Sequence, residues 1–263
     1  MEYCRVEKKG HVAYVTITRP EVMNALHAPA SRELSKVWDD FAADDDLWVG
    51  VLTGEGDRAF SAGNDLKYTA EQSRLPREQR GDQSWPTGGF GGLTSRFDLY
   101  KPIIARVNGF ALGGGLEMAL ACDIIVAADH AEIGLPEPRR GLIAGAMGVH
   151  RLPRQAPLKA AMGYMLTGRH IPAKRAYELG LVSEVVPLAR LDAAVDSMVN
   201  DILRCAPLSV RATKQAAMDG LRVSLEQAGA ADYEWEARRR KSEDAIEGPR
   251  AFAEKRAPNW QGR

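Results

Sequence analysis

Residues 108–141 read NGFALGGGLEMALACDIIVAADHAEIGLPEPRRG, and this stretch decides the fold. Three consecutive glycines, Gly113 to Gly115, lead directly into a segment of helical character. An apolar run typical of a strand follows, with Glu117 on one side and Glu137 on the other. Glycines at a helix N-terminus leave backbone N–H groups free to bind an oxyanion, and two carboxylates can exchange protons with the molecule that carries it. The pattern therefore predicts acid/base groups beside an oxyanion site.

Strands and helices alternate on both sides of this stretch. The runs of β-branched and apolar residues that predict strands are 11–18, 47–53, 102–107 and 124–127. The segments whose spacing or composition predicts helices are 30–41 and 116–122. Residues 59–67 are predicted to form a strand end and a turn, and the polar, glycine-rich residues 68–93 a helix and a mobile covering loop. This alternation predicts α/β architecture with parallel strands.

The last third of the chain has a different character. Residues 159–166 and 173–179 are predicted helices, 180–186 a short strand, and the chain from residue 191 onward is mostly helical. Ser224 and Gln227 have the spacing of a capping box that opens a long helix, which Gly248-Pro249 is expected to break before a short last helix. We predict a catalytic core over residues 1–200 and a helical region over residues 201–263.

Composition excludes several classes of protein. The chain has 263 residues, of which 45% are hydrophobic and 27% charged, as in an ordinary globular protein. Thirty-five basic residues balance thirty-five acidic ones, so no global charge favours nucleic acid or an anionic membrane. No apolar run is long enough to span a membrane, and three scattered cysteines fit a reducing compartment. These features predict a cytoplasmic enzyme.

Other glycine-rich and metal-binding motifs are absent. The glycine run does not match the dinucleotide pattern GxGxxG, and Leu116 stands where a phosphate-binding loop needs lysine. GxSxG does not occur. The five histidines show no metal-ligand spacing, so no metal is predicted, and only His150 lies close downstream of Glu137.

Each candidate residue also has a purely structural interpretation. The three glycines alone could reflect tight strand-to-helix packing, and Glu137 could be an ordinary polar loop residue. Glu117 could be a first-turn glutamate favoured by the helix dipole. However, the apolar residues MALA follow it, so its helix is expected to be buried, and a buried carboxylate requires a reason.

Five segments resemble the crotonase superfamily, also called the enoyl-CoA hydratase/isomerase family. They are ITRPEVMNAL (17–26), AFSAGNDLK (59–67), the block 102–141, LTGRHIPAKRAYELGLVSEVV (166–186) and SEDAIEGPRAFAEKR (242–256). Together they extend over nearly the whole chain in the family's order. The resemblance implies a spiral of repeated ββα units with a helical C-terminal region that builds a homotrimer or a dimer of trimers.

The resemblance also implies an acyl-CoA substrate and a set of site residues. Coenzyme A enters as part of the thioester, so no separate cofactor is expected. The positions that match the family's oxyanion donors are the backbone N–H groups of Asn64 and Gly114. Removing one such donor typically costs roughly 3–4 kcal/mol of barrier. The positions expected to contact the CoA thioester are Ala25, Ala62, Asp65, Leu66, Lys67 and Lys255. Lys255 is expected to reach the CoA that a neighbouring subunit binds.

Glu117 and Glu137 match the catalytic pair of the family's hydratases. The implied reaction is reversible hydration of a trans-2-enoyl-CoA to a 3-hydroxyacyl-CoA, with Glu117 chiefly activating water and Glu137 chiefly protonating C2. The alternatives are a carnitinyl-CoA dehydratase-like enzyme, an enoyl-CoA delta-isomerase, or a lyase or thioester hydrolase on the same scaffold. The basic run 238–241 also allows an RNA-binding relative, although flanking glutamates favour a solvated mixed-charge helix.

Three departures from the common hydratase pattern bear on the acyl group. Residues 143–150 read IAGAMGVH, so Met147, Val149 and His150 are expected to change the floor of the pocket. Asn64 is larger than the alanine or glycine frequent at its position, and AGND also occurs in isomerase relatives. The segments GGFGGLTSRFDL and SEDAIEGP look most like the carnitinyl-CoA dehydratase branch, which implies a polar or charged acyl group.

Overall fold

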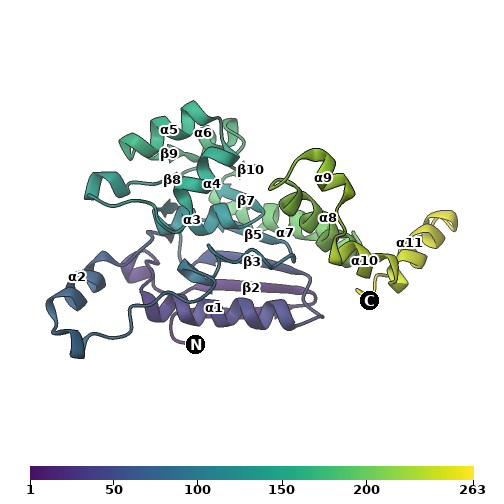
Figure 1. Ribbon diagram of the computed structural model, residues 1–263, viewed down its shortest axis with the longest axis horizontal. Helices are drawn as coiled ribbons and strands as arrows, with labels where there is room; N and C mark the ends of the chain where they lie inside the picture. Colours follow the sequence, from purple (N-terminus) through teal and green to yellow (C-terminus); the bar gives the residue numbers. More distant parts are fainter.

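A six-stranded sheet forms the base of the molecule in the computed structural model, which describes residues 1–263 (Figure 1). Its strands, in spatial order, are β1 (Cys4–Lys9), β2 (Val12–Ile17), β3 (Val49–Gly54), β5 (Ile103–Val107), β7 (Ile124–Ala128) and β10 (Glu184–Val186). Every neighbouring pair from β2 to β10 is parallel, and only β1 runs antiparallel to β2. The predicted α/β architecture with parallel pairing is confirmed.

A second sheet of four short strands lies beside the first. Its strands, in spatial order, are β4 (Ala59–Ser61), β6 (Phe110–Leu112), β8 (Glu132–Gly134) and β9 (Ile171–Pro172). The chain alternates between the two sheets, because β3, β5 and β7 are followed by β4, β6 and β8 respectively. Helices α2 (Leu66–Arg74) and α3 (Gly114–Ala121) close the first two of these units, and the 3-10 turn η4 (Glu137–Arg140) follows the third. The predicted spiral of ββα units is confirmed.

The large sheet buries a nearly continuous apolar core. Half of the residues of strands β2 and β3 are valine, isoleucine or leucine, which suit strands covered on both faces. Helix α1 (Ala28–Ala43) lies along β2 in Figure 1 and buries Leu34, Trp38 and Phe41. The Phe41 ring fits closely against Gly50 of β3, since a Cβ there would lie 3.4 Å from it. The helix predicted over residues 30–41 is confirmed.

The remaining helices divide into two groups (Figure 1). Helices α4 (Gly148–Gln155), α5 (Leu158–Thr167), α6 (Ala173–Glu178) and α7 (Leu191–Leu203) lie close to the sheets, whereas α8 (Pro207–Gly220), α9 (Leu225–Ala230), α10 (Glu234–Arg240) and α11 (Glu243–Ala253) extend away from them. Short 3-10 turns complete the chain: η1 (Pro20–Val22), η2 (Arg77–Gln79), η3 (Phe90–Gly92) and η5 (Leu188–Arg190). No helix has both the length and the apolar character that crossing a membrane requires. The division of the chain near residue 200 stays a prediction.

Two predictions about the C-terminal helices are wrong. The capping box between Ser224 and Gln227 is present, but it opens a helix of six residues rather than a long one. Gly248 and Pro249 lie inside α11 and do not end it. The Ser242 side chain accepts a hydrogen bond from the backbone of Ala245 and so caps the helix upstream of the proline. Gly248 faces the Trp260 ring, because a Cβ there would lie 3.3 Å from it.

Candidate active site

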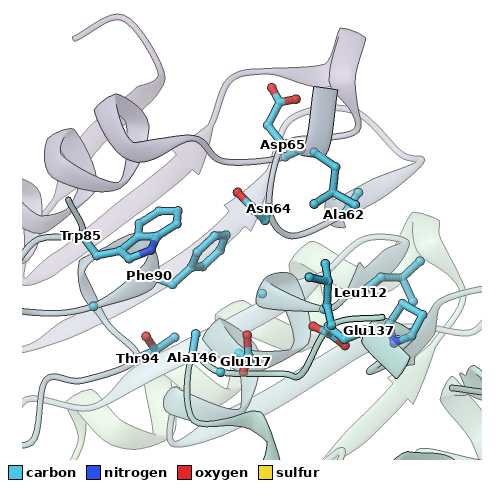
Figure 2. Close-up of a pocket in the computed structure, with 18 of the residues that line it drawn as sticks. Ala62, Asn64, Asp65, Trp85, Phe90, Thr94, Leu112, Glu117, Glu137 and Ala146 are labelled. Atoms are coloured by element: carbon cyan, nitrogen blue, oxygen red, sulfur yellow. The ribbon is translucent and has the colours of Figure 1, made fainter. Parts of the chain in front are cut away.

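A cleft of about 930 Å³ brings most of the predicted site residues together. Its walls come from the loop before α1, the loop before α2, the segment around η3, the start of α3, and η4 with the loop after it. The predicted residues that line it are Ala25, Ala62, Asn64, Asp65, Leu66, Lys67, Gly114, Glu117 and Glu137. Figure 2 shows Asn64 on one side of this cleft, with Glu117 and Glu137 on the other. Lys255 does not line it and follows α11 at the far end of the molecule.

The three glycines at the start of α3 have separate structural roles. Gly113, the N-cap, has φ 55° and ψ −126°, a conformation that glycine adopts far more readily than other residues. A side chain on Gly114 would meet the Phe90 ring at 2.6 Å, and one on Gly115 would overlap the Ser61 carbonyl. Tight packing of α3 against β4 and η3 therefore explains part of the glycine run. This agrees with the alternative, purely structural interpretation of the three glycines.

Two backbone N–H groups at this junction have no hydrogen-bond partner in the chain. They belong to Asn64 and to Gly114, the first residue of α3, whose N–H has no acceptor inside its own helix. Gly63 brings the two loops together, because its φ is +87° and a Cβ there would lie 2.7 Å from the Gly114 nitrogen. The two unpaired donors are thus neighbours beside the same cleft.

The loop that carries Asn64 is fixed from both sides. The Leu26 backbone donates a hydrogen bond to Gly63 O at 2.8 Å and accepts one from the Asp65 N–H at 2.9 Å. The Asp65 carboxylate accepts from the Tyr68 backbone at 3.1 Å, which caps α2, and forms a 3.0 Å ion pair with Arg19. Arg19 also donates to the carbonyl of Ala25. Asp65 lines the cleft, but its carboxylate is engaged in holding the loop in place.

Glu117 is a buried carboxylate without an ion pair. It lies in the first turn of α3 and is 3% exposed. Its Oε1 accepts a 2.7 Å hydrogen bond from the backbone N–H of Gly148, the first residue of α4. Gly148 must lack a side chain there, since a Cβ would lie 2.8 Å from that oxygen. Burial raises the pKa of Glu117 to about 7, with a smaller contribution from Glu137 and opposition from the backbone donors.

Glu137 faces the oxyanion side of the cleft. It is the first residue of η4, and its Oε1 would lie 2.9 Å from a Cβ on Gly113. Its Oε2 is buried and accepts no hydrogen bond. Burial raises the pKa of the Glu137 carboxyl, while its own backbone N–H and Arg140 oppose that shift. Two carboxylates that hold protons more tightly than usual therefore face one cavity, a feature typical of acid/base sites.

The prediction about the pocket floor is wrong. Met147, Val149 and His150 do not line the cleft, because the chain turns into α4 at Gly148. Met147 takes the left-handed conformation, φ 78°, at that turn, and His150 is exposed. The residues of this segment that do line the cleft are Leu142, Ile143, Gly145 and Ala146.

Several residues that line the cleft were not predicted from the sequence, among them Trp85, Phe90 and Thr94. These three belong to the region predicted as a covering loop or follow directly after it, and that region does contribute to the cleft. Trp85 and Phe90 contact each other, with ring centroids 5.1 Å apart. A tryptophan isolated in a polar segment was the available signal, because such a residue usually covers something apolar.

The basic run 238–241 has the arrangement expected of a mixed-charge helix. Arg238 forms a 2.6 Å ion pair with Glu234, and both Arg239 and Arg240 bond Glu236. The structure contains no group of three or more histidine, cysteine, aspartate or glutamate side chains that could hold a metal ion.

Comparison with known proteins identifies the family. The model of the family described as enoyl-CoA hydratase/isomerase matches residues 7–263. An (E)-benzylidenesuccinyl-CoA hydratase from Thauera aromatica is 39% identical over 257 residues, which is 98% of each chain. A carnitinyl-CoA dehydratase from Proteus mirabilis is 40% identical over 261 residues, or 97% of each chain. The crystal structure of an enoyl-CoA hydratase from Mycobacterium tuberculosis H37Rv matches with TM-score 0.91 and 39% identity over 100% of both chains. The chain therefore belongs to the enoyl-CoA hydratase/isomerase, or crotonase, family, as the resemblance of its motifs predicted.

Proposed function

We propose that the protein catalyses the reversible hydration of a trans-2-enoyl-CoA to a 3-hydroxyacyl-CoA. The observation that carries this proposal is the pair of carboxylates formed by the buried Glu117 and the half-buried Glu137, which face one cleft beside two unpaired backbone N–H groups. Hydration requires both a base and an acid, whereas an isomerase of the same family can work with a single carboxylate. The relatives named as a hydratase and a dehydratase support the same class of reaction, in its two directions.

The N–H groups of Asn64 and Gly114 bind the thioester oxygen in this proposal. Addition of water at C3 moves the electrons of the double bond toward the thioester carbonyl, which becomes enolate-like. Donors already positioned at that oxygen stabilise the charge as it develops, without reorganisation during the reaction. The ion pair between Arg19 and Asp65 keeps the Asn64 loop in place.

The two glutamates divide the proton transfers. Glu117 accepts a proton from water as the water oxygen bonds to C3, and Glu137 delivers a proton to C2. In the dehydration direction the roles reverse. A pKa near neutrality suits Glu117 to this exchange, because the ideal pKa of a general base lies near the working pH. Burial contributes most to the raised pKa of Glu117, and the nearby charge of Glu137 contributes less.

The helical C-terminal region is proposed to mediate assembly into a trimer or a dimer of trimers. Large apolar side chains on these helices and the turns beside them are exposed in the single chain, notably Leu221 (81%), Leu225 (88%) and Phe252 (86%). Several large apolar side chains exposed in one region favour an interface between subunits there. Lys255, close to Phe252, would then lie where a neighbouring subunit's CoA could reach it. Light scattering on the purified protein tests this proposal: a monomer contradicts it.

The proposed reaction is tested by following the absorbance of the enoyl thioester. Purified protein is mixed with crotonyl-CoA and, separately, with crotonobetainyl-CoA. Loss of absorbance with either substrate supports hydration, and loss with only the charged substrate assigns the protein to the carnitinyl branch. Retention of the absorbance on both, together with rearrangement of a 3-enoyl-CoA, would instead favour the delta-isomerase.

A further inference from the structure

One positively charged side chain of the cleft has no partner within the chain. Arg140, the last residue of η4, is exposed and lines the cleft. Its guanidinium makes no hydrogen bond and no ion pair. The other cation that lines the cleft is Lys67, which the resemblance assigns to the CoA thioester. Arg140 is therefore a charge that the proposed proton transfers and the predicted CoA contacts leave unused.

Arg140 lies beside the carboxyl that is proposed to protonate C2. Glu137 is the first residue of η4, and Arg140 follows three residues later. Side chains three residues apart in a 3-10 helix point in the same direction, and they are separated by roughly 6 Å along its axis. Burial raises the pKa of Glu137, and the charge of Arg140 opposes that shift, as expected of near neighbours. The guanidinium and the Glu137 carboxyl thus face the same part of the cleft.

The adjacent arginine is directed elsewhere. Arg139 donates a 2.8 Å hydrogen bond from its Nε to the Thr167 carbonyl, at the end of α5. Its side chain packs against Gly168, where a Cβ would lie 2.9 Å from Arg139 Cγ. Arg139 does not line the cleft. The two arginines therefore differ in role, because Arg139 connects η4 to α5 whereas the charge of Arg140 is available to a ligand.

Arg140 lies on the acyl side of the cleft. The CoA contacts predicted within one subunit come from the loop before α1 and from the loop and first turn of α2. Figure 2 shows Asn64 on one side of the cleft, whereas Glu137 and the neighbouring Leu112 lie on the other. Because Arg140 shares a turn and a direction with Glu137, its charge is nearer to the acyl group than to the predicted CoA contacts.

The wall around Arg140 is otherwise apolar. Pro136 precedes η4, Leu142 and Ile143 follow it, and all three line the cleft. Leu142 is 49% exposed and Ile143 is 70% exposed, so their apolar surface is open to a ligand. An acyl group that covers this surface removes it from water, which favours binding. This wall therefore suits an acyl group that has both an apolar part and a negative charge.

We propose that Arg140 binds a carboxylate on the acyl group of the substrate. The substrate is then the CoA thioester of an unsaturated dicarboxylic acid, and a cationic acyl group such as that of crotonobetainyl-CoA is disfavoured. A guanidinium suits this role because its parallel N–H donors match the two oxygens of a carboxylate. This inference rests on the proposed hydration, for which it names the class of acyl group and a specificity-determining residue.

The expected discrimination is limited by the exposure of Arg140. Hydrogen bonds between charged groups are stronger than those between neutral ones, but water and salt weaken them at the protein surface. We expect a carboxylate to be favoured over an uncharged amide of the same size by about tenfold at low ionic strength. The preference should shrink as the salt concentration rises.

Binding of thioesters that cannot be hydrated tests the inference directly. Glutaryl-CoA, adipyl-CoA and a butyryl-CoA with a carboxymethyl branch at C2 are each compared with the thioester whose free carboxylate is replaced by an amide. Calorimetric titration gives the dissociation constants. Saturated thioesters are used because loss of Arg140 also changes the pKa of Glu137 and hence the reaction rate. Wild type should bind the carboxylate member of at least one pair more tightly.

Variants of the two adjacent arginines assign the preference to a residue. Arg140→Gln should abolish it and Arg140→Glu should reverse it. Arg140→Lys should keep part of it, because lysine retains the charge but not the paired donors. Arg139→Gln is the matched control, since it removes a neighbouring exposed arginine that is directed at α5, and it should keep the preference.

Hydration provides a second, independent measurement. The 2-enoyl counterpart of the preferred carboxylate is compared with crotonyl-CoA and crotonobetainyl-CoA. Wild type should show a higher kcat/KM for the carboxylate than for the cationic substrate, and Arg140→Glu should lose or invert this order.

Four results would overturn the inference. They are equal binding of both members of every pair by wild type, an unchanged preference in Arg140→Gln, an equal loss of affinity for both members in that variant, and its dissociation into smaller assemblies in light scattering. The third result would assign Arg140 to the CoA, and the fourth to a subunit contact. Hydration of crotonyl-CoA without any preference contradicts this inference alone. A binding preference without hydration of any substrate contradicts the proposed function alone.

Discussion

The carboxylates of the cleft and those of the C-terminal helices have opposite surroundings. Glu117 is 3% exposed and has no ion pair, and burial raises its pKa to about 7. Glu236 in α10 accepts hydrogen bonds from Arg239 and Arg240, which lower its pKa to about 2. Arg256 has the same effect on Glu247, whose pKa also falls to about 2. Glutamate carboxyls in the same chain therefore differ widely in pKa, depending on whether they are buried or paired with arginine.

This difference shows what prepares a carboxylate for proton transfer. A carboxylate paired with arginine stays ionised at every pH of interest and can neither accept nor deliver a proton near neutrality. A buried carboxylate held only by a backbone N–H can do both. The comparison predicts that changes in the cleft alter the reaction far more than equivalent changes in the C-terminal helices.

The largest effect is expected from the glutamates of the cleft. Glu117→Gln and Glu137→Gln should each lower kcat for hydration by about 10²–10⁴-fold, because each removes a proton-transfer group while keeping the side-chain shape. Steady-state kinetics with an enoyl-CoA measures the loss, and circular dichroism checks that the variants are folded. Activity like that of wild type in either variant would contradict the assignment.

Alanine substitutions at two glycines, Gly63 and Gly56, distinguish the effect of crowding the proposed oxyanion donors from the effect of backbone strain. Gly63 and Gly56 have similar φ values, +87° and +82°, but a Cβ on Gly63 would lie 2.7 Å from the Gly114 nitrogen, whereas one on Gly56 meets nothing within 4 Å. Both alanine variants should lose about 1–2 kcal/mol of stability from the left-handed conformation. Only Gly63→Ala should also lower kcat, by about 10²–10³-fold, because it disturbs the donors.

Urea unfolding and hydration kinetics on both variants check this prediction. Equal losses of kcat in the two variants would mean that backbone strain alone lowers the rate. The proposal that the N–H groups of Asn64 and Gly114 act together as oxyanion donors would then lose its support.

The stability of the protein should depend on pH through Glu117. Its pKa rises from 4.5 to about 7 on folding, so the folded state binds the proton more tightly than the unfolded state. The resulting contribution is fully present below about pH 4.5 and is lost as the pH rises through about 7. A shift of this size corresponds to about 3 kcal/mol. Urea unfolding across this range should show a steeper decline in wild type than in Glu117→Gln, and identical slopes would refute the raised pKa.

The smallest effect is expected from the C-terminal helices. Glu236→Gln removes the partner of the half-buried Arg239 and the exposed Arg240, and ion pairs near the surface contribute little to stability because water screens them. Its melting temperature and hydration rate should stay close to those of wild type. A large loss of hydration activity in this variant would break the contrast between the two regions.

Sequence patterns predicted the large sheet well and the small sheet poorly. β2, β3, β5 and β7 are runs of β-branched and apolar residues, which are strong local signals. β6 and β8 have only three residues each, too few to show any periodicity. Their pairing depends on contacts between distant segments, which local patterns do not contain.

The same limit applies to the site. Glu117, Glu137 and Gly114 all line the cleft, and the sequence could bring them together because one short stretch carries both the glycine run and the carboxylates. Thr94 was missed because its burial results from packing among η3, α4 and the cleft, and nothing in its neighbouring sequence marks it. Met147 and His150 were misplaced because no helix was predicted over residues 148–155, where α4 continues through Pro153.

The most direct test of the account is hydration in water enriched in heavy oxygen. Wild type and the Glu117→Gln variant are incubated with an enoyl-CoA, and the product is examined by mass spectrometry. The account predicts that wild type forms a 3-hydroxyacyl-CoA with one heavy oxygen on C3 and that the variant forms almost none. A wild-type product that has shifted its double bond without gaining oxygen would contradict it.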